Sequence, residues 1–353
     1  MTRGNPLPPL AHTLRRILMD DIGLHQGDSI LIAVSAGPDS MALLQLLASL
    51  RPLLHMELSV AYVDHGLRPH ESPQEWALVQ KTCKELQIDS TRIEVDVAGE
   101  AARQKLSLEH AARNLRYHGL EQLRQALSAD WLALAHTADD QVEEVLLRLM
   151  RGGSRKALAG MRLVSHGRIR PLLQMSKKEL LAYLEEHNYP YCHDSSNDDF
   201  SFLRNRIRHH LLPLLERKYD PGIRHALLKS ADNLAADEAL LEELQQSAWQ
   251  EHVREETISD ADGGSRQMWT FALSGFTALA PALQRRVLER LLYTTQGAAE
   301  YEHILALLKL AATGTQGKEL HLRQGLRAVV DKNALVFSFP WGKGASRRSC
   351  RKG

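Results

Sequence analysis

The sequence predicts an α/β protein in which a parallel sheet carries helices on both faces and is followed by a mainly helical domain with a few short strands. The first observation is the alternation of short apolar runs with helical segments, which is typical of parallel sheets. The runs lie at 29–34, 58–63 and 131–136, the helical segments at 39–50, 74–87, 107–127 and 138–150, and an alternating strand at 91–97.

The second observation is a change of pattern in the later part of the chain. Helical periodicity continues there, and "ELHLRQGLRAVVDKNALVFSF" at 319–339 has the turn residues of short strands. The helical segments are 176–187, 202–218, 223–248, 281–293 and 300–311. We therefore expect one domain over 1–217, a mainly helical domain with short terminal strands over 218–340 and a basic, disordered tail over 341–353.

Composition restricts the class of protein. The 353 residues are 44% hydrophobic and 25% charged, with a formal net charge of +1, so a polyanion site would have to come from local clustering. The three cysteines form no CxxC pair, which argues against a zinc ribbon or a paired-cysteine sulfur carrier. No apolar stretch reaches 18 residues and "MTRGNPLPPL" has no signal-peptide core, so we expect a cytoplasmic protein without a membrane partner.

The stretch "LIAVSAGPDSMALL" joins the first predicted strand to its helix. A strand, a small-residue turn and a helix N-terminus collect backbone N–H groups at one point, which binds phosphate. The turn consists of Ser35, Ala36, Gly37, Pro38, Asp39 and Ser40. Asp39 suits a polyphosphate site if a divalent cation lies between them. Neither GxxxxGK[ST] nor GxGxxG occurs, so the turn is neither a Walker loop nor a dinucleotide loop.

A second polar turn follows the predicted strand at 131–136. His136 ends that strand, and Asp139, Asp140 and Glu143 begin the next helix. The polar turns after parallel strands meet at the ligand-binding edge of the sheet. Acidic residues in a first helical turn also stabilise the helix dipole, so a Mg²⁺ site and a purely structural role both fit this pattern.

Two basic segments complete the candidates. In "SLEHAARNLRYHGL", Glu109 and Arg113 have the i,i+4 spacing of an ordinary helical ion pair. In "FLRNRIRHHLLPLL", Arg204 and Arg208 share a helical face beside Asn205, an arrangement that suits either RNA phosphates or a solvated charged surface.

The turn at 35–40 resembles the pyrophosphate loop of the N-type ATP pyrophosphatases, a Rossmann-like class whose pattern is Ser-Gly-Gly-x-Asp-Ser. Ala36 departs from this pattern, where the class has glycine. If position 36 needs a positive φ, its Cβ costs about 1–2 kcal/mol of strain.

The ordered set DHGLR, LEHAARNLRY, AHTADDQVEE with MRGG, IRPLL and DSSNDDFSFLRNRIRHHLLPLL is similar to that of the tRNA(Ile)-lysidine synthetases. This resemblance implies an ATP-dependent ligase that joins L-lysine to C2 of the wobble cytidine of the CAU-anticodon isoleucine tRNA. An adenylated cytidine is the implied intermediate, and decoding changes from AUG to AUA. ATP and Mg²⁺ are the implied cofactors.

The resemblance also implies that 1–217 is an N-type ATP pyrophosphatase catalytic domain and 218–340 a tRNA-binding domain, and it implies roles for the candidate residues. Residues Ser35 to Ser40 and His136 would contact the nucleotide, and Asp39 and Asp140 the metal. Arg113 would face the activated cytidine or the ATP phosphates, and the tRNA would meet Arg204, Asn205 and Arg208. Asp39, Asp139 and Asp140 would position metal and phosphates, while Asp140 and Glu143 are alternative carboxylates for activating the lysine amine.

Two competing readings and one open point remain. A tRNA thiolase would use the same loop, and a dead nucleotide-binding module would explain Ala36. Longer family members carry a further C-terminal domain that this chain is too short to include, which leaves open how it grips the acceptor end and rejects methionine tRNA. A homodimer is likewise left open.

Overall fold

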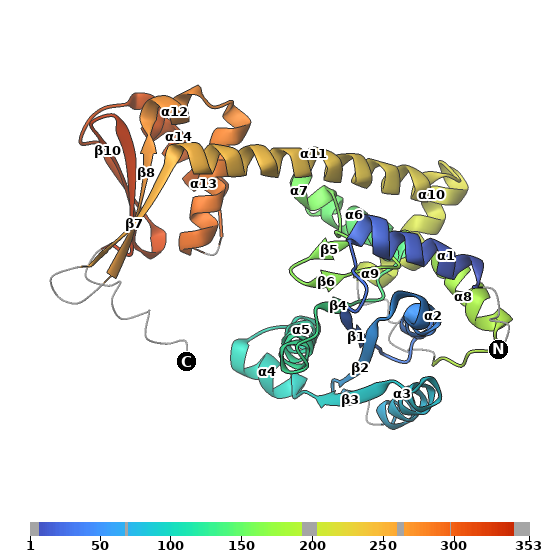
Figure 1. Cartoon of the computed structure of the whole chain (residues 1–353). Helices are drawn as coiled ribbons and strands as arrows, with labels where there is room; N and C mark the ends of the chain where they lie inside the picture. The colour runs from blue at the N-terminus through green and yellow to red at the C-terminus, as the bar shows by residue number, and fades with distance from the viewer. Residues whose placement is uncertain (1–6, 68–69, 193–202, 260–264, 297, 342–353) are drawn as a thin grey trace. The chain divides into compact units, whose positions relative to one another are not determined.

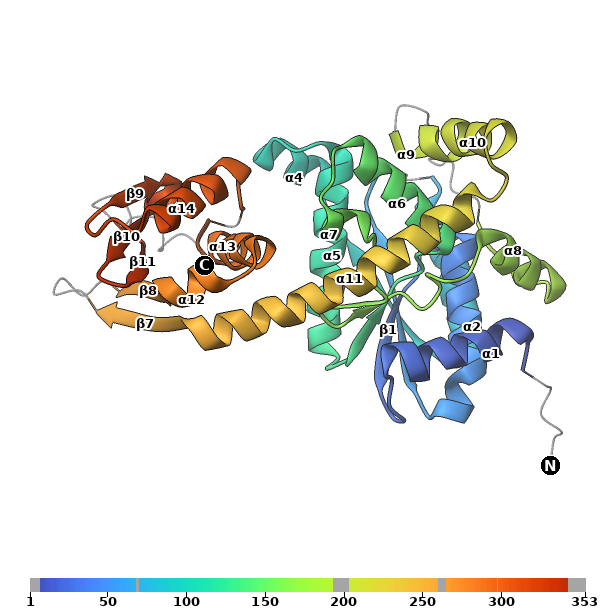
Figure 2. The same ribbon diagram turned by 90° about the horizontal axis from the view of Figure 1, so that it is seen from above.

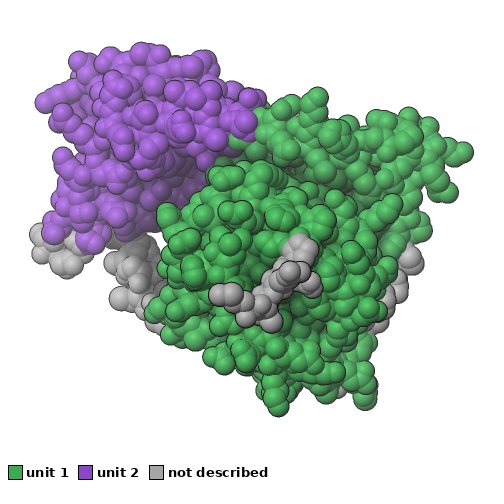
Figure 3. Space-filling model, turned by 45° about the vertical axis from the view of Figure 1, so that its right-hand side comes forward, with its two compact units in different colours: residues 1–235 green, residues 236–353 purple. Residues whose placement is uncertain are grey.

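The computed structural model describes residues 7–67, 70–192, 203–259, 265–296 and 298–341. The first part of the motif DSSNDDFSFLRNRIRHHLLPLL, residues 194–202, and nearly all of the predicted tail at 341–353 therefore lie outside the described residues. The chain forms two compact units, Met1–Ala235 and Ala236–Gly353, coloured separately in Figure 3. The division at Ala235 falls inside the long helix Ile223–His252. The domain boundary predicted at 217 falls instead at the end of the preceding helix, Leu212–Lys218, and stays a prediction.

The first unit contains a six-stranded sheet with the order β3-β2-β1-β4-β6-β5 (Figures 1 and 2). All neighbouring strands are parallel except β5, which pairs antiparallel with β6. The strands are β1 (Ser29–Ala33), β2 (Glu57–Asp64), β3 (Asp89–Glu94), β4 (Trp131–Ala133), β5 (Val164–Ser165) and β6 (Arg168–Ile169). The predicted parallel α/β fold is thus confirmed.

Helices cover both faces of this sheet. Their bounds are α1 (Pro9–Arg16), α2 (Pro38–Leu54), α3 (Ser72–Leu86), α4 (Val97–Gln104), α5 (Leu108–Ala126), α6 (Ala138–Met150), α7 (Arg155–Leu158), α8 (Lys177–Glu186), α9 (Leu203–Arg206), α10 (Leu212–Lys218) and α11 (Ile223–His252). Alternation along β1 separates the two cores. Ile30 and Ile32 join the core formed with α1, α2 and α8, whereas Leu31 joins Leu120 of α5 on the opposite face.

Several predicted elements are shorter or broken in the structure. The strand predicted at 131–136 ends at Ala133, and the one predicted at 91–97 ends at Glu94 because Asp96 caps α4 by accepting a hydrogen bond from the Gly99 amide. The helix predicted at 202–218 is divided by a π-helical segment, Ile207–Leu211, between α9 and α10. A second π-helical segment, Ile17–Ile22, continues α1.

The second unit contains a five-stranded antiparallel sheet with the order β7-β8-β11-β10-β9. Its strands are β7 (Val253–Ser259), β8 (Ser265–Ala272), β9 (Glu319–Leu322), β10 (Leu326–Asp331) and β11 (Ala334–Phe339), and its helices are α12 (Leu273–Ala278), α13 (Pro281–Gln296) and α14 (Tyr301–Thr313), besides the end of α11. The sequence analysis predicts neither β7 nor β8. Strand β7, "VREETIS", is almost wholly polar and exposed, whereas β8, "SRQMWTFA", buries Trp269 and Phe271. In the described part of the chain, no helix combines the length and apolarity needed to cross a bilayer.

Candidate functional site

The turn between β1 and α2 has the backbone geometry of an anion site. Helix α2 begins at Pro38, its N-cap is Gly37, and no side chain caps it. An uncapped helix N-terminus leaves amide groups for an external anion. Two hydroxyls lie beside these amides: Ser40 Oγ donates to the Gly37 carbonyl at 2.9 Å, and Ser35 Oγ lies 3.4 Å from Ser40 Oγ.

Ala36 occupies the left-handed region, with φ of +60°, so position 36 does need a positive φ. Its side chain is fully buried in the core beneath the loop. Its carbonyl accepts a hydrogen bond from the Cys192 amide at 2.9 Å. Packing and this hydrogen bond hold a conformation that alanine alone disfavours.

Asp39 and Asp140 come together across the ends of β1 and β4, bridged by a lysine. Lys177 Nζ lies 3.4 Å from Asp39 Oδ2 and 3.4 Å from Asp140 Oδ1. The second Asp39 oxygen, Oδ1, is buried and has no hydrogen-bond partner among the described residues. Burial raises the pKa of Asp39, although Lys177 opposes the shift.

Asp140 is held by its own helix. Its Oδ2 accepts hydrogen bonds from the amide of Thr137 at 2.9 Å and from the Thr137 hydroxyl at 3.0 Å, which completes a capping box at the start of α6. Burial alone would raise the pKa of Asp140, but Lys177, Arg204 and the Thr137 amide lower it to about 2. Asp140 is therefore ionised at neutral pH.

Glu143 forms a buried ion-pair cluster with the two arginines that the sequence assigned to tRNA. Only 1% of its side chain is exposed. Arg204 Nε donates to Oε2 at 2.9 Å, and Arg208 donates to both oxygens, at 2.6 and 3.0 Å. These carboxylate bonds raise the pKa of both arginines against the opposing effect of burial. The neighbouring Asn205 is also buried.

Asp139 points toward other helices rather than toward Asp39. Its Oδ2 accepts from the Lys177 backbone amide at 2.8 Å, and its Oδ1 pairs with Arg224 Nη1 at 2.9 Å. Asp139 thereby connects α6 to the N-terminus of α8 and to α11. This placement fixes the helix that carries Lys177.

His136 lies directly before the capping box, at the end of the β4 segment. Its Nδ1 is buried without a partner among the described residues. Burial, together with Arg170, Arg116 and Arg204, lowers the pKa of His136 to about 3 despite the opposing effect of Asp140. His136 is therefore a neutral imidazole that can donate or accept one hydrogen bond on each ring nitrogen.

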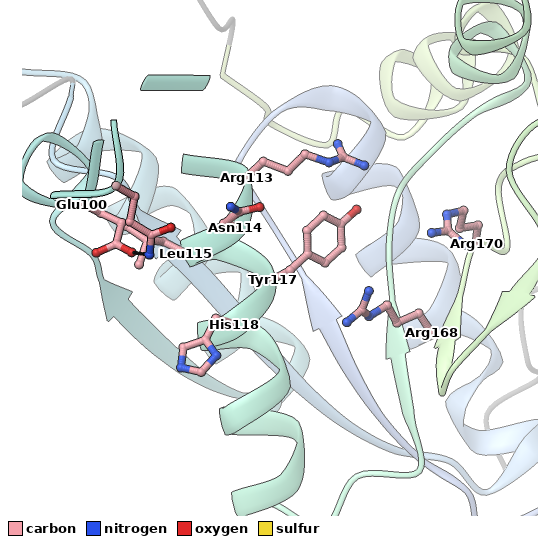
Figure 4. A pocket seen from close by; sticks show the side chains of 9 residues that line it. Glu100, Arg113, Asn114, Leu115, Tyr117, His118, Arg168 and Arg170 are labelled. Atoms are coloured by element: carbon pink, nitrogen blue, oxygen red, sulfur yellow. Dashed lines mark hydrogen bonds between the residues drawn. The ribbon is translucent and has the colours of Figure 1, made fainter. Parts of the chain in front are cut away.

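Arg113 lies apart from the carboxylates, in a pocket of about 680 Å³ lined by α4, α5 and the β6 segment (Figure 4). Its guanidinium lies 5.1 Å from the ring centre of Tyr117. Arg168 and Arg170 line the same pocket. The predicted ion pair between Glu109 and Arg113 is wrong: the described structure records no contact between them, and Arg113 turns to the aromatic ring instead.

The residues fit a bound Mg²⁺ ion through two carboxylates. Among the described residues, no three histidine, cysteine or acidic side chains are grouped to hold a metal. Mg²⁺ at nucleotide sites is commonly held by one or two carboxylates plus phosphate oxygens and water. Asp39 and Asp140 match that requirement, because a cation already bridges them and Asp39 Oδ1 has a free lone pair.

Three residues of these sites were missed by the sequence reasoning: Lys177, Arg168 and Arg170. A signal for Lys177 was present, because "SKKE" at 176–179 is a capping-box pattern that starts a helix at residue 177. Its contact with Asp39, more than a hundred positions earlier, needs the tertiary structure. Arg170 lies within the motif "IRPLL" at 169–173 and Arg168 directly precedes it, and the motif alone gives neither residue a role.

Comparison with known proteins gives consistent results. A sequence model of the PP-loop domain matches residues 8–215. The tRNA(Ile)-lysidine synthase of Geobacillus kaustophilus is 34% identical over 325 residues, which cover 90% of this chain and 68% of that protein. The enzymes of the same name from Geobacter sulfurreducens and Bacillus subtilis are each 33% identical, covering 88% and 89% of this chain.

Among solved structures, the U34-tRNA thiolase of Methanococcus maripaludis is similar in fold. The TM-score is 0.54 at 20% identity, over 64% of this chain and 78% of the thiolase. At this identity the likeness concerns the fold alone. The chain spans about two thirds of the length of the three curated relatives, at 68%, 65% and 66%.

Proposed function

The chain belongs to the tRNA(Ile)-lysidine synthase family of PP-loop ATP-using ligases, and from this premise we propose that it joins L-lysine to the wobble cytidine of a CAU-anticodon isoleucine tRNA. ATP would activate C2 of the base as an adenylate with release of pyrophosphate, and the ε-amine of lysine would then displace AMP. The product would decode AUA rather than AUG. The observation that supports this assignment best is the bridge from Lys177 to Asp39 and Asp140, a site that accepts a lysine ammonium.

The ATP phosphates would bind at the uncapped N-terminus of α2. Ser35 and Ser40 offer hydroxyl donors there, and the extended Gly37 lets a phosphate approach the backbone. The bond between the α and β phosphates breaks in an adenylation, so the loop must hold the departing pyrophosphate. Fixed amide and hydroxyl donors stabilise the charge that develops on it.

Asp39 and Asp140 would hold Mg²⁺, which would neutralise phosphate charge when bound. Asp39 Oδ1 supplies an oxygen that has no other described partner. Because Lys177 Nζ stands on the other carboxylate oxygens, it must leave them before a metal ion can use them. Once displaced, this ammonium is available to the phosphates beside it.

Asp140, rather than Glu143, is the better carboxylate for the substrate amine. Both oxygens of Glu143 already accept hydrogen bonds from Arg204 and Arg208, and its side chain is closed to solvent. Asp140 Oδ1 contacts a movable ammonium. Lys177 is the strongest influence that lowers the pKa of Asp140, and Mg²⁺ in its place would keep that pKa low, so Asp140 would hold the substrate amine as an anionic hydrogen-bond acceptor.

The remaining candidates fit positioning roles. Arg204 and Arg208 would fix Glu143 in place and keep Asp140 ionised through their positive charge. Their exposed parts would be available to RNA. Neutral His136 would contact the nucleotide or the flipped base. Bases in a single-stranded anticodon loop leave the stack at modest cost, which makes the wobble cytidine accessible. The cytoplasm, where tRNA and ATP are present, is the proposed compartment.

The decisive experiment uses a transcript of the CAU-anticodon isoleucine tRNA, Mg-ATP and radiolabelled lysine. Retention of label in the RNA, dependent on ATP, is the expected result. A methionine tRNA transcript with the same anticodon is the matched substrate control. Folded protein that binds the tRNA but neither releases pyrophosphate nor retains label would instead support a dead nucleotide-binding module, and sulfur incorporation would support a thiolase.

A further inference from the structure

The pocket beside α5 contains a concentration of positive charge, of which the resemblance to the family assigns only Arg113 to the reaction. Arg113 of α5 and Arg168 and Arg170 of the β6 segment line the pocket (Figure 4). Arg116 of α5 does not line it but contacts the same tyrosine. Three of the guanidiniums lie over one aromatic ring, that of Tyr117, at 5.1 Å for Arg113, 5.6 Å for Arg116 and 4.9 Å for Arg168. We refer to these four arginines and Tyr117 as the arginine pocket.

No carboxylate of the described residues forms an ion pair with any of these four arginines. Glu100, an acidic residue of the lining, is paired with Arg103 at 2.7 Å. Arg170 Nη1 donates to the Arg162 carbonyl at 2.9 Å. The Nε atoms of Arg168 and Arg170 are buried with no described partner.

This arrangement disfavours the empty pocket. Like charges repel one another, and the buried Nε atoms of Arg168 and Arg170 have lost hydration that no described partner replaces. Stacking on Tyr117 recovers only about 0.5–2 kcal/mol per cation. Burial lowers the pKa of both Arg116 and Arg170, and the positive charge of Arg113 adds to the shift in each. An anion brought into the pocket would supply negative charge to the three arginines that line it.

We propose that the arginine pocket binds backbone phosphates of the substrate RNA next to the nucleotide that enters the catalytic site. This inference rests on the proposed function, because it takes the RNA as the substrate. Guanidinium groups bind phosphates through paired N–H donors, and such contacts set the position of an RNA without reading its sequence. The pocket would therefore position the anticodon loop.

Location favours RNA over ATP as the source of these phosphates. The amide-rich turn at 35–40 already offers a separate site for the triphosphate. Arg113, Asn114 and His118 are exposed, so the pocket opens to a macromolecule in solution. His136 feels the charges of both Asp140 and Arg170, which places it electrostatically between the two sites. A base that reaches the carboxylates would leave its neighbouring phosphates beside the pocket.

The test measures RNA affinity with a fluorescein-labelled anticodon stem-loop of the isoleucine tRNA over a series of KCl concentrations. Wild type is compared with Arg168→Gln, Arg168→Lys and Arg113→Gln, and with Lys81→Gln, which removes an exposed charge of α3 outside the pocket. Affinity for a non-hydrolysable ATP analogue is measured on the same preparations. Arg168→Gln should weaken RNA binding roughly tenfold and reduce the slope of log affinity against log salt by about 0.7 per lost contact.

Arg168→Lys should keep most of that slope, and ATP affinity should not change in the two Arg168 variants or in Lys81→Gln. Melting adds a readout independent of RNA: Arg168→Gln should melt no lower than wild type, because it relieves repulsion. The inference is overturned if RNA affinity is unchanged, if Lys81→Gln loses as much as Arg168→Gln, or if ATP affinity falls instead. Wild type that binds the stem-loop through the pocket yet never incorporates lysine would overturn the proposed function and leave this inference standing.

Discussion

Replacing Lys177 with methionine tests whether its ammonium stands in the place of a metal ion. The two carboxylate contacts are both 3.4 Å long, and the exposed fractions are 27% for Lys177, 21% for Asp39 and 12% for Asp140. At an effective dielectric constant of about 20, each contact is worth about 5 kcal/mol before desolvation. Desolvation and partial exposure reduce the net value of the pair of contacts to about 1–3 kcal/mol.

A metal ion that binds to Asp39 and Asp140 must first displace this ammonium. Lys177→Met removes the competition, so Mn²⁺ should bind the variant about 5- to 150-fold more tightly than wild type. The backbone amide of residue 177, which donates to Asp139, is unaffected by the substitution. Without metal the variant should lose about 1–3 kcal/mol of unfolding free energy, since two carboxylates then repel each other across the gap.

The assay is Mn²⁺ binding by electron paramagnetic resonance without nucleotide, followed by urea unfolding with and without Mn²⁺. Lys178→Met is the matched control, because Lys178 is exposed and forms no recorded ion pair. It should leave both measurements at wild-type values. Equal Mn²⁺ affinity in Lys177→Met and wild type would refute the idea that the ammonium and the metal share one position.

Three further predictions concern stability. Ala36→Gly should change the unfolding free energy by no more than about 1 kcal/mol, because the relief of strain is offset by the entropy of glycine and the loss of a buried methyl group. Ala36→Val should destabilise strongly, because a β-branched residue disfavours this positive φ, and melting curves distinguish the two variants. Asp64 accepts hydrogen bonds from Gly66, Ser72 and Arg92 that outweigh burial and lower its pKa, so its stabilisation is present above the ordinary aspartate pKa and lost as pH falls through the lowered one. Asp64→Asn should therefore cost about 1–3 kcal/mol at pH 7 and progressively less from pH 5 to pH 3, as measured by urea unfolding. Arg286→Met should destabilise the second unit by about 3–5 kcal/mol by leaving the buried Glu238 unpaired, and the double variant with Glu238→Gln should recover much of this loss in the same assay.

The sequence was sufficient for the parallel sheet because its strands are short, apolar and separated by regular helices. The sequence also predicted a site at the ends of β1 and β4, because a polar turn follows each of these two apolar strands. It was insufficient for β7, whose polar composition gives no strand pattern and which is stabilised by pairing with β8.

The partners of the charged residues were also beyond the sequence. Arg204 and Arg208 share a helical face in the sequence as in the structure, but nothing in their spacing indicates that Glu143 lies under that face. The sequence therefore leaves Glu143 as a candidate for lysine activation, because it does not show that two arginines donate to both carboxylate oxygens. Contacts of this kind join segments more than sixty residues apart, and periodicity carries no information about them.

The π-helical turn at Ile207–Leu211 lets one helical stretch point its arginines at the carboxylates and its later leucine at an apolar cluster, although a regular α-helix would not place both correctly. Before and within the turn, Arg204 and Arg208 face the carboxylate cluster; beyond it, Leu212 packs against Val142 and Leu146 in an apolar cluster. A π turn holds more residues than an α turn, so it shifts the angular register of everything that follows. Deleting one residue there would rotate the apolar stripe by about 100° relative to the arginines. An insertion or deletion in this segment would therefore break either the ion pairs of the two arginines with Glu143 or the apolar packing of Leu212.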